Sequence, residues 1–459
     1  MEKTLLIACG ILLAGLLAFF GCKPKAPAVE TKPFVSEVVH PDWAKNAVLY
    51  EVNTRQFTPE GTFKAIEAHL PRLKELGVDI LWFMPINPIG IKNRKEPLGS
   101  YYSVKDYLDV NPEFGKLTDF KALVAKAHEL GFHVIMDWVP NHTSWDNKLT
   151  EQHPDWYVKN SAGKFIPPLG FDWTDVIQLD WKKKELQDYM AEALKFWVNL
   201  GVDGFRVDHP DLTPPAFWER VRTELTIIRP VLMVAENEGQ YDFVKKGFDM
   251  SYAWELHHLM NSIAQGKDSV TALNRYYRKE KATFPPDVYR MTFLDNHDEN
   301  SWAGTINSRM GAAQDPFAVF IFTTNGFPLL YNGQEAGLAK SLKFFVKDTI
   351  KWETGRFTPF YQGLIKLKKA NRALWNGAAG GTMDSIRTNR ENKVFAFCRE
   401  KDENRVVVFL NLRKKDVSLK PDLSNLKGDY TEYFSGKKVS FPLADSLRLE
   451  PYGYMVFVK

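Results

Sequence analysis

The sequence predicts an α/β fold: a (β/α)₈ barrel with a small inserted subdomain after the third strand and a second, antiparallel β domain at the C-terminus. Eight apolar, strand-like runs lie between residues 47 and 335, with helical segments between most of them. Glycines follow three of these helical segments directly, and glycine is favoured just past a helix end. After about residue 376 the pattern changes to short alternating runs, which predict antiparallel strands.

Each element follows from its own pattern. The strand-like runs are residues 47–53, 78–85, 132–142, 202–208, 230–238, 248–254, 289–298 and 327–335, and helical segments cover 63–77, 119–131, 184–201 and 215–228. Apolar strands joined by helical crossovers indicate a parallel sheet. An open doubly wound sheet is the alternative, but no glycine-rich phosphate loop follows the first strand.

The domain boundaries follow from changes in these patterns. The irregular stretch at about residues 142–182 is longer than a usual loop and predicts the inserted subdomain. We expect the barrel domain to span residues 41–375 and the C-terminal β domain to span residues 376–459.

Charge and composition narrow the function classes. The chain of 459 residues has a formal net charge of only +4, so the sequence gives no sign of a nucleic-acid partner. Aromatic residues make up 14%, which fits either a large core or rings that stack on sugars. Composition does not separate these two readings.

The N-terminus has the pattern of a secretory signal. Residues 1–21 combine a short charged start with a long apolar run, and Gly21-Cys22 follows. A small residue before cysteine resembles the lipobox of bacterial lipoproteins, which implies a lipid attached to Cys22 and a membrane anchor. Residues 22–40 are rich in proline and lysine and predict a tether. The alternative is an uncleaved membrane anchor at residues 4–20.

Acidic residues gather where the predicted barrel strands end. Asp208 ends the fourth strand, Glu236 follows the fifth and Asp298 follows the seventh. Barrel enzymes carry their chemistry at these carboxyl ends. Each residue alone fits a turn or a helix cap, but like charges that converge on one mouth cost free energy and therefore indicate a site.

Two close carboxyl groups suit retaining glycoside hydrolysis, in which one attacks and the other donates a proton. Arg206 lies two residues before Asp208 and shares its strand face, so we expect Arg206 to keep Asp208 ionised. Glu236 follows an apolar strand, and we expect burial to raise its pKa.

The motifs at these strand ends resemble those of the α-amylase family, glycoside hydrolase family 13. The matching segments are DWVPNH (137–142), GFRVD (204–208), AEN (235–237), FLDNHD (293–298) and YNGQE (331–335). The resemblance runs from about residue 48 to the C-terminus. It implies this barrel, a subdomain inserted after the third strand and a C-terminal β-sandwich.

The resemblance also implies roles for single residues. Asp208 would be the nucleophile, Glu236 the acid/base and Asp298 the stabiliser of the transition state. The substrate-binding residues would be Tyr102, His142, Arg206 and His297. Four tryptophans in loops would either stack on glucose units or pack the subdomain: Trp145, Trp156, Trp173 and Trp302.

The chain departs from the family pattern in two places. Asp211 and Leu212 stand where many members have a Lys-His pair, and His209 fits neither common choice for predicting linkage. Asn141 matches the calcium asparagine of the family, but Gln178 stands where an acidic ligand is common. We therefore expect no required cofactor and little or no calcium dependence.

The expected function is retaining hydrolysis of α-glucosidic bonds, α-1,4 in the first instance, in starch-derived glucans or maltooligosaccharides. A transglycosylase or isomerase of the same family and a non-catalytic glycan-binding protein on the same barrel are the alternatives. A lyase or metal hydrolase would need a cluster of metal ligands that the sequence lacks. The expected location is the bacterial cell envelope, lipid-anchored and facing the periplasm or the cell surface.

Overall fold

The computed structural model describes residues 36–459. The predicted signal peptide (1–21), the lipid attachment site Cys22 and most of the predicted tether lie outside the described residues. Within residues 36–459, no helix is both long enough and apolar enough to cross a bilayer.

Eight parallel strands close into a barrel, which confirms the predicted fold class. Their order around the barrel is β1-β10-β9-β8-β7-β6-β3-β2. The strands are β1 (Leu49–Val52), β2 (Ile80–Phe83), β3 (His133–Trp138), β6 (Gly204–Val207), β7 (Leu232–Ala235), β8 (Met250–Tyr252), β9 (Tyr289–Thr292) and β10 (Phe327–Tyr331). Each falls within one of the eight runs expected from the sequence.

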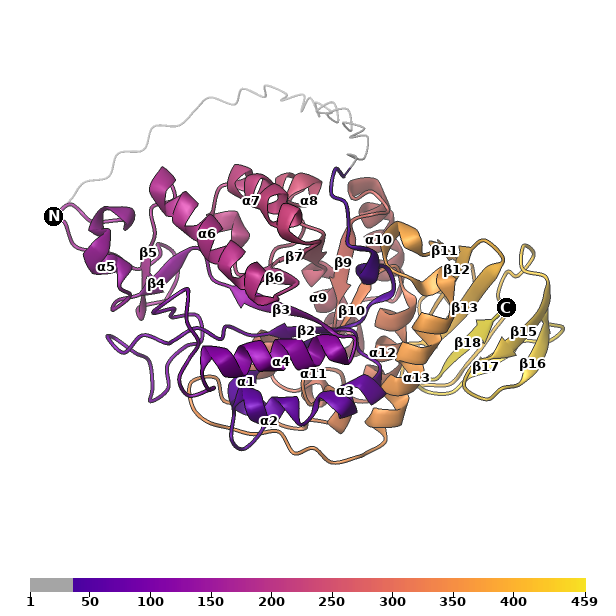
Figure 1. Ribbon diagram of the computed structural model, residues 1–459. Coiled ribbons are helices and arrows are strands. Elements are labelled where there is room, and N and C mark those ends of the chain that lie inside the picture. The colour runs from indigo at the N-terminus through magenta and orange to yellow at the C-terminus, as the bar shows by residue number, and fades with distance from the viewer. Residues whose placement is uncertain (1–35) are drawn as a thin grey trace, which may run out of the picture. The chain divides into compact units, whose positions relative to one another are not determined.

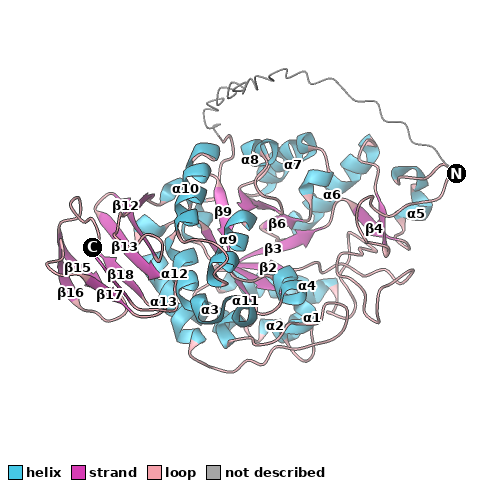
Figure 2. Ribbon diagram, turned by 180° about the vertical axis from the view of Figure 1, so that it is seen from behind, coloured by secondary structure: helices cyan, strands magenta, loops and turns pink. Residues whose placement is uncertain are grey.

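Helices surround these strands (Figures 1 and 2). They are α1 (Thr54–Phe57), α2 (Phe63–Glu67), α3 (Leu70–Leu76), α4 (Leu117–Glu129), α6 (Lys184–Leu200), α7 (Pro215–Ile228), α8 (Tyr241–Lys246), α9 (Trp254–Ala264), α10 (Thr271–Thr283), α11 (Ile306–Met310), α12 (Gln314–Thr323) and α13 (Phe357–Ala370). Gly77 ends α3 with φ 98° and Gly201 ends α6 with φ 124°, backbone angles that glycine adopts without strain.

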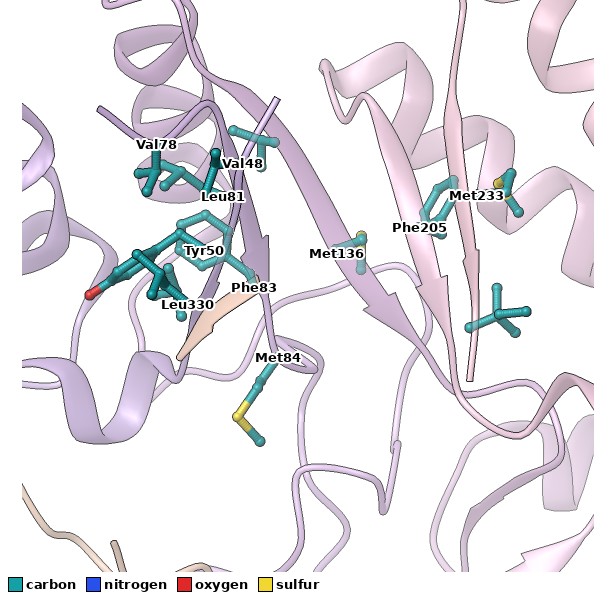
Figure 3. Close-up of a cluster of buried hydrophobic side chains, with 14 of the residues drawn as sticks. Val48, Tyr50, Val78, Leu81, Phe83, Met84, Met136, Phe205, Met233 and Leu330 are labelled. Carbon is teal, nitrogen blue, oxygen red and sulfur yellow. The ribbon is translucent and has the colours of Figure 1, made fainter. Parts of the chain in front are cut away.

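Alternation along each strand divides the core into two layers. Leu49, Ile80 and Val234 belong to a cluster inside the barrel, whereas Tyr50 and Leu81 belong to the layer between strands and helices, shown in Figure 3. Side chains two residues apart share a face, so the residues that follow the inward apolar ones point toward the barrel axis. This alternation positions the site.

The segment between β3 and α6 forms a small structure of its own. It contains β4 (His142–Ser144), α5 (Leu149–Gln152) and β5 (Val176–Gln178), with β4 and β5 paired antiparallel. The strand β4 begins with a histidine of the predicted site, so this insertion supplies one wall of the pocket described below.

The C-terminal region is antiparallel throughout. One sheet has the order β11-β12-β13-β18-β15-β16 and a second pairs β14 with β17. The strands are β11 (Thr382–Ser385), β12 (Val394–Lys401), β13 (Asn404–Asn411), β14 (Val417–Leu419), β15 (Gly428–Glu432), β16 (Lys438–Phe441), β17 (Leu447–Leu449) and β18 (Tyr454–Val458). The two sheets share one apolar cluster that contains Phe409, Leu419 and Leu449, as expected for a sandwich.

The C-terminal sheet is joined to the barrel through α12. Every residue of α12 from Pro316 to Thr323 is buried, because the barrel covers one side and β13 the other. Buried Arg399 of β12 donates to the backbone oxygens of Gly381 (2.8 Å) and Trp375 (3.2 Å), and to Thr324 at the end of α12. The guanidinium thereby satisfies helix-end carbonyls that would otherwise be buried without donors.

Candidate active site at the carboxyl ends of the barrel strands

Charged side chains fill the barrel interior where the apolar layers end. Glu51 follows inward Leu49, Asp137 follows inward Ile135 and Glu236 follows inward Val234. Arg206 and Asp208 continue the inward face of β6, and all five side chains are buried. Gly204 begins β6 as glycine because a Cβ there would lie 2.0 Å from the backbone oxygen of Leu232.

Arg206 is shared by three carboxylates. Its Nη1 lies 2.8 Å from Asp137 Oδ1 and 3.3 Å from Asp208 Oδ1, and its Nη2 forms an ion pair with Glu236 Oε1. Its Nε donates to the Tyr252 hydroxyl at 3.1 Å. The sequence-based expectation named Asp208 as the partner, but Asp137 and Glu236 approach the guanidinium more closely.

Asp208 and Glu236 lie side by side, with an oxygen of one within 4.8 Å of an oxygen of the other. Such a spacing suits retention rather than inversion, which requires roughly 6.5–9.5 Å between the carboxyl groups. Burial, together with the neighbouring charge of Glu236, raises the pKa of Asp208 to about 8. Burial also acts to raise the pKa of Glu236, but the charges of Arg206 and His209 outweigh burial and lower that pKa.

These opposite shifts favour one shared proton for the pair near neutral pH, and the charges of Arg206 and His209 beside Glu236 favour Asp208 as its holder in the absence of substrate. This is the reverse of the protonation expected from the sequence. The reason is the position of Arg206 Nη2, which faces Glu236, a residue 30 positions along the chain that the local pattern around Arg206 did not reveal.

His209 adopts an unusual backbone conformation directly after Asp208. Its φ of 39° is left-handed, which is strained for a residue with a side chain. This turn directs its backbone N–H at Glu236 Oε2 (3.2 Å) and brings its ring Nε2 within 3.9 Å of the same oxygen. Phe171 stacks on Trp173 at 4.0 Å between ring centres, and both rings lie next to His209.

His297 is the centre of a second charged group. Its Nδ1 lies 2.6 Å from Glu51 Oε1, and its Nε2 lies 2.6 Å from the Tyr102 hydroxyl and 3.5 Å from Asp298 Oδ2. Burial acts to lower the pKa of His297, but the charges of Asp298 and Glu51 outweigh burial and raise it to about 9. The Tyr102 ring stacks on His297 at 5.6 Å.

Sequence reasoning missed Glu51. The available signal was position: Glu51 lies at the carboxyl end of the first strand and on the same face as inward Leu49. The predicted residues Tyr102, His297 and Asp298 are brought together as expected, and Glu51 joins them from 246 residues away along the chain.

His142 lies at the start of β4, with its ring 5.3 Å from that of Trp173. Burial lowers the pKa of His142 to about 3, so the ring is neutral over the whole working range of pH. A neutral imidazole can both donate and accept a hydrogen bond, which suits contact with a hydroxyl group.

Residues from both charged groups line one pocket of about 350 Å³. Its lining consists of Lys95, Ser100, Tyr102, His142, Trp173, Asp175, Val176, Asp208, His209, Glu236, His297, Asp298, Trp302, Phe344 and Phe345. The volume and the aromatic walls suit one or two sugar rings. A larger groove of about 1300 Å³ between the β2–α4 loop and the subdomain contains none of the predicted catalytic residues.

The four tryptophans fall into different settings. Trp173 and Trp302 line the pocket, and Trp302 is 62% exposed. Trp145 lines the larger groove and Trp156 is buried in the core. Trp173 and Trp302 are therefore placed where they could stack on a sugar, whereas Trp156 is part of the hydrophobic core.

The residues at the family calcium position have protein partners. Asn141 Oδ1, the atom that would bind calcium, accepts a hydrogen bond of 2.7 Å from Gln178 Nε2. Asp175, nearby in the subdomain, pairs with Lys95 at 3.5 Å. Calcium takes six to eight oxygen ligands, and here the Asn141 oxygen and the Asp175 carboxylate already have protein partners.

Another group of potential metal ligands, around His257, is already satisfied. Asn261 Nδ2 lies 3.0 Å from His257 Nε2, and Glu299 pairs with His257 at 2.9 Å and with Arg309 at 3.6 Å. An arginine beside the only carboxylate disfavours a bound cation.

Two family models match the chain. A model described as "Alpha amylase, catalytic domain" matches residues 39–373, and a model described as "Maltogenic Amylase, C-terminal domain" matches residues 386–456. Together they cover the barrel and most of the C-terminal sheets.

Individual relatives agree with these matches. "Alpha-amylase 2" of Dictyoglomus thermophilum is 25% identical over 455 residues, which cover 90% of this chain and 75% of that protein. Among solved structures, a maltogenic α-amylase from Thermotoga neapolitana has a TM-score of 0.83 at 26% identity, covering 91% of this chain and 99% of its own. An α-amylase from Lactobacillus plantarum has a TM-score of 0.80 at 30% identity, with coverage of 91% and 99%.

Proposed function

The chain belongs to the α-amylase family and acts as a glycosidase on α-glucans, and on that premise we propose that it cleaves α-1,4 bonds of maltooligosaccharides with retention. The observation that carries the proposal is the pair Asp208 and Glu236, with oxygens within 4.8 Å of each other in one aromatic-walled pocket. Two carboxyl groups at this spacing can act as nucleophile and acid/base on the same bond.

The reaction needs the shared proton on Glu236. Asp208 in its ionised form attacks the anomeric carbon, while Glu236 protonates the glycosidic oxygen of the departing sugar. Positive charge that develops on the sugar beside Asp208 stabilises the carboxylate form of Asp208 and favours transfer of the proton to Glu236. Water then attacks the glycosyl-enzyme bond, with Glu236 as the base.

The second charged group acts on the same sugar. Asp298, whose side chain is 38% exposed, faces the pocket and stabilises the charge that develops at the transition state. His142 and His297 lie on the pocket wall within reach of hydroxyl groups, and Tyr102 presents a ring face for stacking. Arg206 keeps the carboxylates in place.

Transglycosylation is the second candidate, because an exposed aromatic face lies beside the acid/base. Phe171 is 39% exposed and stacks on Trp173. Both rings lie next to His209, whose Nε2 is 3.9 Å from Glu236 Oε2. An acceptor sugar stacked on this face could compete with water for the glycosyl-enzyme intermediate.

The test is product analysis on soluble starch, pullulan and maltoheptaose. We expect α-configured maltooligosaccharides by NMR from the wild type, and no products from Asp208→Asn. Products longer than the substrate at high maltoheptaose would instead support transglycosylation. An inert wild type that still binds starch would favour the non-catalytic glycan-binding alternative and overturn the proposal.

We also propose a lipid anchor and an envelope location, from the signal-like residues 1–21 and Cys22. In a bacterial host, the mature protein should begin at an acylated Cys22 and fractionate with membranes, facing the periplasm or the cell surface. An intact mass that retains residues 1–21 would contradict the lipoprotein proposal.

Calcium independence is a further part of the proposal. The Asn141–Gln178 amide pair supports it, because this pair ties β4 to β5 without a cation. No other cofactor is required by the proton transfers described above.

A further inference from the structure

His297 is held at both ring nitrogens by buried partners. Glu51 Oε1 lies 2.6 Å from Nδ1, and the Tyr102 hydroxyl lies 2.6 Å from Nε2. His297 and Glu51 are fully shielded from solvent, with exposures of 1% and 0%. Glu51 comes from β1 and His297 follows β9, so the contact crosses the barrel interior.

A count of protons fixes the state of the ring. The Tyr102 hydroxyl has one proton, and it lies 3.2 Å from Asp137 Oδ2 as well as near His297. Burial raises the pKa of Asp137 only to about 6, so Asp137 is ionised at neutral pH and accepts from Arg206, Trp82 and Tyr102. With its proton given to Asp137, Tyr102 accepts from His297 Nε2–H.

The other ring nitrogen also carries a proton. Glu51 is a carboxylate that accepts from Nδ1–H, and its second oxygen has no hydrogen-bond partner among residues 36–459. His297 is therefore the one hydrogen-bond donor to the Glu51 side chain within the described chain. Burial of the Glu51 charge is offset by the positive charge of its single partner, His297. The charged state of His297 is in turn stabilised by Glu51.

We propose that Glu51 is a positioning residue for the reaction: it holds the His297 ring so that Nε2–H, rather than a bare nitrogen lone pair, is presented to the Tyr102 hydroxyl and to Asp298 at the pocket wall. The inference rests on the proposed function of this pocket. Glu51 does not touch the pocket itself, since it is absent from the pocket lining. Its effect passes through His297, as a buried aspartate orients the histidine of a serine protease.

The charges around His297 explain why a dedicated partner is needed. Arg206 of β6 faces the ring and disfavours its charge, and burial does the same. Asp298 next along the chain, Asp137 of β3 and Glu236 of β7 favour the charged ring. Among the carboxylates around the ring, Glu51 alone makes a hydrogen bond with Nδ1, so Glu51 fixes that edge of the ring while Tyr102 contacts Nε2.

The sign of the pH dependence follows. The pKa of His297 is raised to about 9 in the folded protein, above the ordinary value of about 6.5. The ring is therefore a two-nitrogen donor below about pH 9 and loses one donor above that pH. Without the Glu51 charge and hydrogen bond, Asp298 would still oppose burial and Arg206, and the pKa of His297 should fall from about 9 toward its ordinary value.

The test compares Glu51→Gln with a matched control, Glu335→Gln. Glu335 is equally buried, pairs with Arg72 at 2.8 Å, accepts from the Tyr50 hydroxyl and also has an unpartnered oxygen, but it lies outside the pocket. The readouts are titration of the ¹⁵N-labelled His297 ring by NMR, assigned with His297→Asn, and the pH profile of kcat/KM on a chromogenic maltoside.

In the wild type, the His297 ring should stay charged until about pH 9. In Glu51→Gln it should titrate at a pH clearly below 9, and the basic limb of kcat/KM should shift down with it, with a loss of roughly 10²-fold at pH 8. Glu335→Gln should lower stability but change neither the titration nor the pH profile.

A neutral His297 ring at pH 7 in the wild type would overturn the proposal, and this measurement needs no variant to fold. An unchanged titration in Glu51→Gln would overturn it too. The NMR readout is independent of turnover. A wild type that is inert on glucans while its ring titrates as expected would refute the proposed function and leave the assignment of Glu51 standing.

Discussion

The pocket is bounded by two groups of charged residues, one centred on an arginine and the other on a histidine. The Arg206 group comprises Asp137, Arg206, Asp208 and Glu236, and the His297 group comprises Glu51, Tyr102, His297 and Asp298. Arginine is charged at every pH a protein meets, whereas buried histidine is charged only while a partner keeps it so.

This difference decides what each group can do. A permanent cation serves three carboxylates and leaves one proton free to move between Asp208 and Glu236, which general acid/base chemistry requires. A conditional cation needs its own counter-ion, Glu51, and then gives a hydrogen-bond donor whose state does not change near neutral pH. The Arg206 group can therefore transfer a proton during the reaction, whereas the His297 ring stays protonated throughout.

The largest expected effect comes from Asp208→Asn. Removal of the nucleophile should lower kcat by roughly 10⁴-fold or more, measured on maltoheptaose. The variant should also be more stable than the wild type near pH 8, because the folded wild type must accommodate a buried carboxyl group whose pKa is raised to about 8. The folded form of such a group binds a proton that the unfolded form has released, so wild-type stability falls as pH rises from about 4 to 8.

Thermal melts at pH 4 and pH 8 check the stability claim. The gain in Tm of Asp208→Asn should be present at pH 8 and small at pH 4. Asp188→Asn, at an exposed surface pair, is the control and should show neither change. A gain that is larger at pH 4 would contradict the assignment of the proton to Asp208.

Arg206→Met breaks the first group at its centre. Three buried carboxylates lose their shared cation, so the free energy of unfolding should fall by about 3–5 kcal/mol. Urea unfolding followed by tryptophan fluorescence measures this. The control is Arg220→Met, at a part-exposed pair with Asp188, where the loss should stay below about 1 kcal/mol. Equal losses in the two variants would show that Arg206 does not carry the group.

His297→Asn breaks the second group and should be milder. The value of kcat/KM should fall roughly 10²-fold, because Tyr102 and Asp298 at the pocket wall lose their charged partner. The loss of stability should be smaller than for Arg206→Met, since burial raises the pKa of Glu51 and lets this residue take up a proton when its partner is removed. His258→Asn, on the exposed side of α9, is the control. A stability loss as large as that of Arg206→Met would erase the distinction between the groups.

The smallest effect tests whether either group depends on a metal. A chelator should leave Tm and kcat unchanged, because Asn141 and Gln178 bond to each other where a cation would be expected. Gln178→Ala should cost about 1 kcal/mol through loss of this hydrogen bond, and activity should follow only modestly. A clear drop in Tm on chelation would refute calcium independence.

Local sequence patterns were enough for the fold. Runs of apolar residues marked all eight barrel strands, because parallel strands buried on both faces must be apolar along their length. Gly77 and Gly201 marked helix ends because left-handed angles favour glycine. The change to alternating runs after residue 376 predicted the antiparallel region, since each of those strands has one face to bury.

The site residues could also be identified from short segments of the sequence. Asp208, Glu236 and Asp298 could be named because strand ends of a barrel must converge at one mouth, whichever residues occupy them. The structure brings them, with Tyr102, His142 and His297, to one pocket. Their catalytic roles stay predictions until the variants above are measured.

The sequence by itself thus determined the barrel, the antiparallel region and the residue types at the mouth, because these depend on periodicity within single segments. Only the tertiary structure decided which charges meet: that Arg206 faces Glu236 as well as Asp208, that Asn141 pairs with Gln178, and that Glu51 holds His297 from 246 residues away. Electrostatic energies depend on distances of a few ångströms between side chains, and barrel closure sets those distances between strands that are remote along the chain.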